Sequence, residues 1–471
     1  MHKACLFLFY FLILTAVPAH MACAKEKNLA KTPVKTKNFV RTDLTMGLGQ
    51  AVRAALQENP RIKAGNWKVK AAKEGVGASL GYFYPSLSFE SRYMRTDNPT
   101  YVFMAKLDQQ RFAQSDFQID SLNSPPSIND FQNSLRLDQV VYSRRLIAGE
   151  RMSKEDEASD GLDFKRLKEQ VTMDTVRAYL RVITARNFLD AANKALDDTS
   201  EHEGLAKLRY NSGLGLYSDV LRATAANREA MTGVAAAQEN YEVAKRALGL
   251  AIGEAQSIDA RGLSYDVKLQ PIESYYASAE SRPDIKAIEA RYDKAKSGVD
   301  FASAGYFPEV GVSGQYQWND HRSPVDAEGS SYMATAFLKW DIFDGTTREH
   351  EVSQAKARVR QAEEGLDGAK KEASFMVFAA YQDVLTAQKS LDYAKAELDS
   401  ASEGRRLVEL RYKNSLSPLI DLLDAQVMVE KARTGVIVAQ SSLIEKFFAL
   451  GFESGRISEF IQKAKNGQNK E

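Results

Sequence analysis

Residues 410–425 read LRYKNSLSPLIDLLDA, and a related stretch lies earlier in the chain, where residues 208–214 read LRYNSGL. The two stretches are 202 positions apart, and the same offset relates Asp219 to Asp421. Nearer the N-terminus the offset becomes 223 and pairs identical residues: Pro60 with Pro283, Gly75 with Gly298, and Pro85 with Pro308. A fixed offset between similar segments indicates a duplicated structural unit. We therefore expect two copies of one unit.

Each copy is predicted to contain a helical segment, a pair of strands and a long helical hairpin. The helical segments end before Pro85 and Pro308, because proline cannot continue a helix and favours an extended chain before it. Long proline-free runs rich in Ala, Glu, Lys, Arg and Leu then predict helices that are roughly 90 Å long at 1.5 Å per residue. The predicted segments are helical at 43–84 and 274–307, strand pairs at 85–142 and 308–343, helical hairpins at 143–256 and 344–453, a linker at 257–273 and a C-terminal tail at 454–471.

The predicted strands are amphipathic, with one apolar, aromatic face and one mostly polar face. Apolar residues that alternate with polar ones include Leu87, Phe89 and Tyr93 in copy one, and Val310, Val312, Tyr316, Trp318, Tyr332, Leu338 and Trp340 in copy two. Each strand has about the 9 to 11 residues needed to cross a bilayer within a barrel. Four strands cannot close a barrel, since small barrels need about eight, and open edges are not tolerated in lipid. Several chains must therefore share one barrel, and a trimer would supply about 12 strands.

Residues 1–24 have the pattern of a secretory signal peptide. Lys3 gives the positive start, and an apolar run of 12 residues, Leu6 to Val17, precedes Ala22-Cys23-Ala24. That run is too short to span a bilayer. A flexible basic tail at 25–42 is expected to follow.

Both cysteines, Cys5 and Cys23, lie within the predicted signal peptide. Cleavage after Ala24 would leave a mature chain without a thiol, which excludes disulfides and thiol chemistry. Lipidation of Cys23 is the alternative, although His20 stands where lipoprotein signals usually carry Leu.

Composition excludes several function classes. The chain has 63 Lys and Arg against 62 Asp and Glu, a balance that gives no electrostatic attraction for nucleic acid. A mean hydropathy of -0.38 is too polar for a bundle of membrane helices. No phosphate-binding loop, nucleophile elbow or paired metal motif occurs. His202, His321 and His350 are scattered without metal-ligand spacing and are expected at the surface, so neither an enzyme nor a metal or cofactor site is predicted.

The signal peptide, the duplicated unit and the two tip sequences at 208–214 and 410–425 together resemble the outer membrane efflux protein family, the TolC-like exit ducts. The resemblance implies a mainly α fold with a transmembrane β part. By this resemblance, a homotrimer forms a 12-stranded β-barrel in outer membrane lipid, continued by a 12-helix α-barrel in the periplasm. It also implies two partners, a periplasmic adaptor protein and an inner-membrane pump or ABC transporter. Such a duct is passive and catalyses no reaction.

Asp421 and Asp424 are the candidate pore residues. Three positions apart on a helix, they share a face, and three chains would place six carboxylates around one constriction, which favours cations. Acids in the first turn of a helix also complement its dipole, and this simpler explanation stays open. Copy one has Asp219 and Arg222 instead, a self-neutralising pair, which suggests that only the second hairpin lines the constriction.

The resemblance assigns further roles at the tips. It adds Tyr412 to the constriction, where Tyr412 and Asp421 join a closing network with an Arg in the turn. This chain has Ser417-Pro418 in place of that Arg, so its latch must differ. The family also docks its adaptor through Gly followed by a small or apolar residue. Gly213-Leu214 fits that pattern, whereas Leu416 follows Ser415 instead of Gly, and a plain left-handed turn explains Gly213 equally well.

Two other function classes remain as alternatives. A periplasmic coiled-coil scaffold or tether would explain the helices but has no use for lipid-facing strands. A surface receptor or adhesin would act through the long external loop predicted at 96–130. Within the duct class, small-molecule efflux and type I protein secretion both fit.

Overall fold

A computed structural model describes residues 44–263, 265 and 267–468 of the chain. The predicted signal peptide at 1–24, the basic tail at 25–42 and Cys23 lie outside the described residues, as do the last three residues of the chain. A four-stranded sheet and two long helical hairpins make up most of the described part, as the sequence predicted.

The sheet has four antiparallel strands in the order β2-β3-β5-β6. Their bounds are Ser86–Thr96 for β2, Ile128–Tyr142 for β3, Glu309–Asp320 for β5 and Gly329–Lys339 for β6. Strand β2 pairs with β3 over its whole length, and β3 pairs with β5 with one irregularity near Val140. Within the described residues, β2 and β6 each have a partner on one side only. The sheet therefore has two open edges.

The register separates the two faces of the sheet. One face carries Phe89, Leu135, Tyr316 and Tyr332, which lie opposite one another across the four strands. The residues that alternate with these along each strand, such as Arg92 and its partner Gln132, belong to the other face. The apolar face is largely uncovered in the single chain, and Tyr332 is 85% exposed. The amphipathic alternation expected from the sequence is thus the pattern of this sheet.

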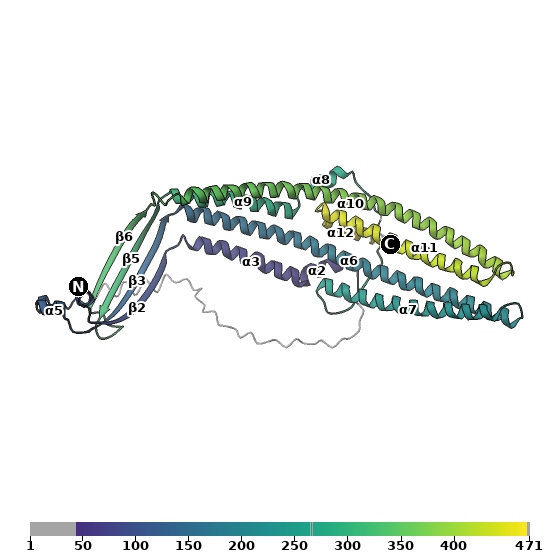
Figure 1. The fold of residues 1–471 in the computed structure, drawn as a ribbon, viewed down its shortest axis with the longest axis horizontal. Coiled ribbons are helices and arrows are strands. Elements are labelled where there is room, and N and C mark those ends of the chain that lie inside the picture. Colours follow the sequence, from purple (N-terminus) through teal and green to yellow (C-terminus); the bar gives the residue numbers. More distant parts are fainter. Residues whose placement is uncertain (1–43, 264, 266, 469–471) are drawn as a thin grey trace. The chain divides into compact units, whose positions relative to one another are not determined.

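Long helices run away from the sheet, which Figure 1 shows at one end of the described part. They are α6 (Arg144–Asn211) with its return helix α7 (Tyr217–Ile252), and α10 (Thr347–Lys413) with α11 (Leu419–Glu453). Shorter helices pack beside them: α2 (Leu48–Glu58), α3 (Pro60–Gly81), α8 (Ile272–Ala279) and α9 (Pro283–Ser303). At 68 residues, α6 is about 100 Å long. The order strand, strand, long helix, return helix occurs in residues 86–252 and again in 309–453.

Four segments differ from the expected boundaries. Residues 454–471, expected as a tail, contain helix α12 (Ile457–Gln468), and Leu44–Met46 and Ile258–Ala260 form a small parallel pair, β1 and β4, where a helical segment and a linker were expected. The loop 96–130 contains α4 (Pro99–Asp108), a 3-10 turn and α5 (Ile119–Asn123). Helix α12 exists because Ile457, Phe460 and Ile461 recur at helical spacing and bury one face in the core.

The main core lies where the helical hairpins meet the small parallel pair. Tyr179 is fully buried there, and its hydroxyl donates to the backbone oxygens of Met46 (3.1 Å) and Arg261 (2.7 Å). Burial raises the pKa of Tyr179 to about 12, so the phenol stays a neutral donor. Phe448 of α11 belongs to the same cluster. One tyrosine therefore ties helix α6 to both short strands.

A charged network fastens α9 to the end of α11. The Arg282 guanidinium, in a side chain that is 9% exposed, donates to Asp284 (2.6 Å) and to the backbone oxygen of Glu453 (2.9 Å). Arg166 of α6 donates to the neighbouring backbone oxygen of Phe452 (2.9 Å). Because these charges are largely withdrawn from water, each depends on its partners.

Replacing Arg282 by alanine should therefore destabilise the fold by about 3 kcal/mol, because Asp284 and Glu453 lose their counter-charge. Thermal unfolding followed by far-UV circular dichroism at equal protein concentration measures the loss. Lys371→Ala is the matched control, since Lys371 is exposed and pairs one turn away with Asp367. An equal shift in both variants would contradict the structural role of Arg282.

Candidate functional site at the hairpin tips

Both helical hairpins turn with the same backbone geometry. Gly213 (φ 74°) and Ser415 (φ 61°) occupy the left-handed position after α6 and α10. The N–H of Leu214 donates to the Arg209 oxygen (2.9 Å), and the N–H of Leu416 donates to the Arg411 oxygen (2.8 Å). These bonds define a Schellman turn, which satisfies the last carbonyls of each helix. The turn itself thus accounts for Gly213, while Ser415 adopts the same conformation without being glycine.

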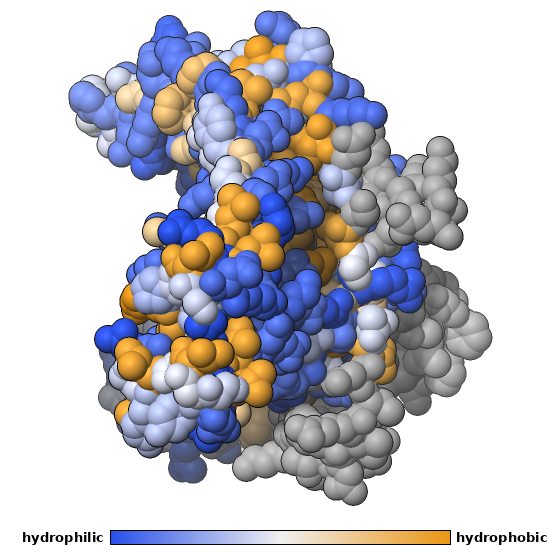
Figure 2. Space-filling view, turned by 90° about the vertical axis from the view of Figure 1, so that its right-hand side faces the viewer, coloured by the Kyte–Doolittle hydropathy of each residue, from blue (hydrophilic) through white to orange (hydrophobic). Residues whose placement is uncertain are grey.

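The leucines of the two turns are exposed. Leu214 is 72% and Leu416 is 68% exposed. Leu216 and Tyr217 on the first tip are exposed as well. Figure 2 looks onto the end of the molecule that carries the tips and shows orange hydrophobic groups among hydrophilic ones. Apolar side chains at a solvent-facing turn are available for contact with another protein.

Tyr412 lies in a small core that joins the two tips. The side chain is 3% exposed and clusters with Leu419 and Leu422 of the second hairpin and with Val220 and Ala223 of the first. Burial raises the pKa of Tyr412, an effect that the nearby Arg209 opposes. Tyr412, expected at a constriction, is therefore a packing residue between hairpins in the single chain.

Arg209 is the residue that sequence reasoning missed. Its guanidinium donates to the Tyr412 backbone oxygen (2.8 Å) and to the Ser415 hydroxyl (2.9 Å), and it lies 4.8 Å from the Tyr412 ring centroid. An arginine from the first tip thus holds the second. The available signal was the repeat itself, because Arg209 matches Arg411 and precedes a turn in both copies.

Asp421 and Asp424 lie at the start of α11, and both are exposed. Among the residues that the structure describes, neither carboxylate has a hydrogen-bond or ion-pair partner. Asp219 and Arg222, the corresponding pair of opposite charges in the first hairpin, form no direct ion pair with each other within the same described part. The three residues predicted at the constriction therefore lie in different environments. Tyr412 is buried inside the tip, whereas Asp421 and Asp424 lie on its surface.

Two histidines differ from the expectation of scattered surface residues. His202 is buried between the hairpins, and this burial lowers its pKa. His321 lies in the turn after β5, where its Nδ1 contacts Glu328 (2.5 Å), and Asp320 is near enough that the three groups could hold a metal ion. The Nε atom of Arg322 lies 3.1 Å from Nε2 of His321, and the Arg322 guanidinium forms an ion pair with Glu328 (3.4 Å). The Arg322–Glu328 ion pair and the contact between His321 and Glu328 close the turn.

A model of the family described as outer membrane efflux protein matches residues 51–254 and 275–453. The chain belongs to this family. The match takes in both helical hairpins and both strand pairs, and it starts within α2 and ends at Glu453. As a member of the family, the protein is located in the outer membrane and extends into the periplasm.

Relatives and solved structures agree with that assignment. This outer membrane efflux protein is 26% identical over 421 residues to protein CyaE of Bordetella pertussis, a match that spans 88% of this chain and 84% of CyaE. Outer membrane protein TolC of Vibrio cholerae is 24% identical over 38% of this chain and 40% of its own length. The crystal structure of CusC has a TM-score of 0.75 at 15% identity, covering 87% of this chain and 92% of that one. The fold is that of TolC-like channels.

Arg209→Ala should loosen the contact between the two hairpins. The variant loses two hydrogen bonds from a charged donor, together worth about 1 to 2 kcal/mol at a partly exposed site, so local opening should become roughly tenfold more frequent. Hydrogen exchange of the backbone amides in 408–424 measures that opening. Arg406→Ala is the control, since Arg406 pairs with Glu403 on its own helix. Equal exchange in both variants would show that Arg209 does not hold the tips.

Proposed function

We propose that this outer membrane efflux family member is the passive outer membrane duct of a tripartite efflux or type I secretion system. The observation that carries the proposal is the joining of an amphipathic, open-edged sheet to two long helical hairpins. A sheet with one apolar face suits lipid on that side and water on the other. The helices extend the passage into the periplasm. Such a protein moves its cargo without catalysing a reaction.

The duct is a homotrimer in this proposal. In the part of the chain that the structure describes, the outer edges of β2 and β6 have no strand partner, and lipid cannot satisfy the backbone groups left there. Three copies of the sheet, joined edge to edge, give a closed barrel of about 12 strands. The repeated order of strands and helices in the two halves of the chain supports an internal duplication that builds the barrel wall from similar units.

Helix α11 offers further support for assembly. An 18-residue window within α11 has a mean hydropathy of 1.3, and only 28% of that window is buried in the single chain. Val427, Met428 and Val438 are among its exposed apolar residues. Neighbouring copies in a helical barrel would cover this surface, which explains why a helix outside the membrane is so apolar.

The hairpin tips carry both the constriction and the partner contacts of the proposed duct. Asp421 and Asp424, which have no partner in the described residues, would form a ring of carboxylates once three copies meet. Tyr412 and Arg209 would hold that ring in its resting position. Gly213, Leu214 and Leu416 would meet the periplasmic adaptor, which in turn connects to an inner-membrane pump or ABC transporter. The two exposed leucines are the observation that favours this docking face.

Single-channel recording in a planar bilayer tests the duct and its ring. The protein should show discrete, cation-preferring openings, more frequent in Arg209→Ala, and Asp421→Ala with Asp424→Ala should reduce the cation preference about tenfold by removing the negative ring. Asp219→Ala is the matched control, because Asp219 occupies the corresponding position of the first hairpin. Openings with unchanged selectivity in the double variant would discard the ring. Absence of openings in both the wild type and Arg209→Ala would contradict the duct.

Assembly gives an independent test. Extraction from membranes should require detergent, and native mass spectrometry of the extracted protein should give three chains per particle, because a four-stranded sheet has no closed form alone. A chain that stays soluble and monomeric without detergent would favour the scaffold explanation. Deleting 99–123 tests the receptor explanation, since a duct still conducts ions without that loop whereas a receptor loses its partner.

A further inference from the structure

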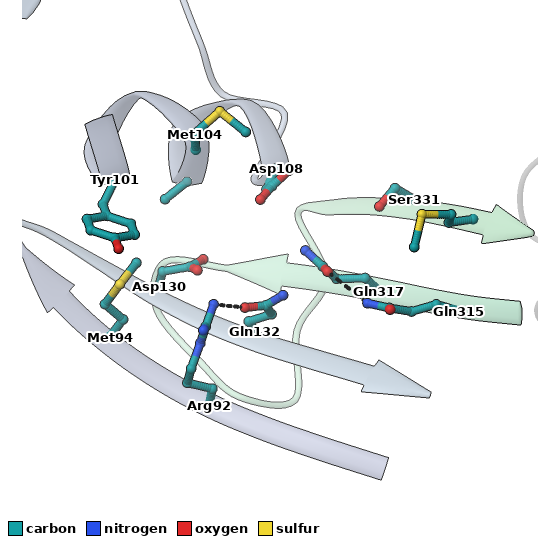
Figure 3. A pocket seen from close by; sticks show the side chains of 12 residues that line it. Arg92, Met94, Tyr101, Met104, Asp108, Asp130, Gln132, Gln315, Gln317 and Ser331 are labelled. Atoms are coloured by element: carbon teal, nitrogen blue, oxygen red, sulfur yellow. Dashed lines mark hydrogen bonds between the residues drawn. The ribbon is translucent and has the colours of Figure 1, made fainter. Parts of the chain in front are cut away.

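Helix α4 lies across the polar face of the sheet, at the end farthest from the long helices. It follows the last residue of β2, Thr96, and packs against β5 and β6. Figure 3 shows the helix carrying Tyr101, Met104 and Asp108 above the strands. Because the polar face is the one that would line water in a closed barrel, α4 occupies space on the water side.

A buried polar contact fixes the C-terminal end of α4. The side-chain amide of Gln109, which is 1% exposed, donates to the Asn129 backbone oxygen (2.9 Å) and to the Asp130 carboxylate (2.8 Å). Asn319 of β5 donates to both oxygens of the same carboxylate (3.0 and 3.1 Å). Val102 and Ala105 are buried beneath the helix. Buried and fully paired polar groups of this kind specify one arrangement.

Gly329, the first residue of β6, allows the close approach of α4. A Cβ atom at this position would lie 2.0 Å from the Asp108 backbone oxygen and 2.9 Å from Gln109. Real Cβ atoms do not come that near, so any side chain here must move the helix. A side chain at position 329 would collide with α4, and this is why glycine is required there. The backbone conformation does not require it, because Gly329 is not in the left-handed region.

A cavity of about 280 Å³ remains between α4 and the sheet. The strands contribute polar groups to it, including Arg92, Gln132, Gln315 and Gln317, and α4 contributes Tyr101, Met104 and Asp108. Tyr101 and Met104 are both more than half exposed. The helix thus presents side chains both to the cavity and to the space in front of the sheet.

We propose that α4 is a fixed constriction at the outer mouth of the duct, where it contributes to the selection of cargo separately from the hairpin tips. The inference rests on the proposed function, which makes the polar face the wall of the passage. Three copies of α4 on that wall narrow the opening, and Tyr101, Met104 and Asp108 are the groups that passing cargo meets. Gln109, Asp130 and Gly329 are positioning residues that hold the helix in place.

Cysteine labelling tests the constriction without removing α4. Met104→Cys, treated with a positively charged methanethiosulfonate during single-channel recording, should lose about half of its conductance because the adduct enters the passage. Val325→Cys is the control, since Val325 is 85% exposed in the β5–β6 turn. Treated wild type accounts for Cys5 and Cys23. An unchanged conductance in fully labelled Met104→Cys overturns the proposal while leaving the duct intact.

A pair of glycine variants tests the seat of the helix. Gly329→Ala should displace α4 and raise the conductance about twofold, whereas Gly314→Ala should not, because an added Cβ at Gly314 meets nothing within 4 Å. Native mass spectrometry of both variants checks assembly. Equal conductance of the two assembled variants overturns the role of Gly329 and of the helix it seats. Absence of openings in every variant, Arg209→Ala included, overturns the proposed function itself and with it the constriction.

Discussion

The outer edges of β2 and β6, which have no strand partner within the described residues, are the constraint on which the rest of the structure depends. Water would satisfy the backbone groups on these edges, but the hydrocarbon of an outer membrane cannot, so an isolated chain has no stable place in the bilayer. The amphipathic register follows from the same requirement, because a wall one strand thick must meet lipid on one face and water on the other. Family membership locates the chain in that membrane, and in the proposed duct further copies would pair these edges.

The long helices are packed more firmly in one region than at their tips. The largest buried cluster, with Tyr179 and Phe448, lies where the hairpins meet β1 and β4, and the network around Arg282 reinforces it. The tips have a cluster of six buried residues centred on Tyr412. Small clusters open at lower free energy than large ones. The tips are therefore less firmly packed than the junction with β1 and β4, and in the proposed duct they would open more easily.

Local sequence patterns were sufficient for most of the fold, and long-range contacts account for what they missed. Pro85, Pro308 and the alternation in 308–319 predicted where helices give way to strands, because each effect acts within a few residues. The pairing of β1 with β4 joins residues more than 200 positions apart, and neither segment has a strong pattern of its own. The role of Arg209 was missed for the same reason, since its acceptors belong to the other hairpin. Asp421 and Asp424 were placed correctly near the start of α11, but the ring proposed for them involves other copies, whose contacts a single chain does not contain.

The chemistry of the tip contact also suggests how the proposed duct would form a latch without the arginine that Ser417-Pro418 replaces. Arg209 donates to a backbone oxygen and a hydroxyl, neither of which carries charge or titrates in the ordinary pH range. A latch built from a carboxylate would consume the negative charge of Asp421 in holding the tip closed. Because Arg209 uses neutral acceptors, it holds the hairpins together without engaging Asp421 or Asp424, the residues that would line the passage in the proposed duct. In the proposed duct, closing the tip and selecting ions would therefore be separate tasks for separate residues.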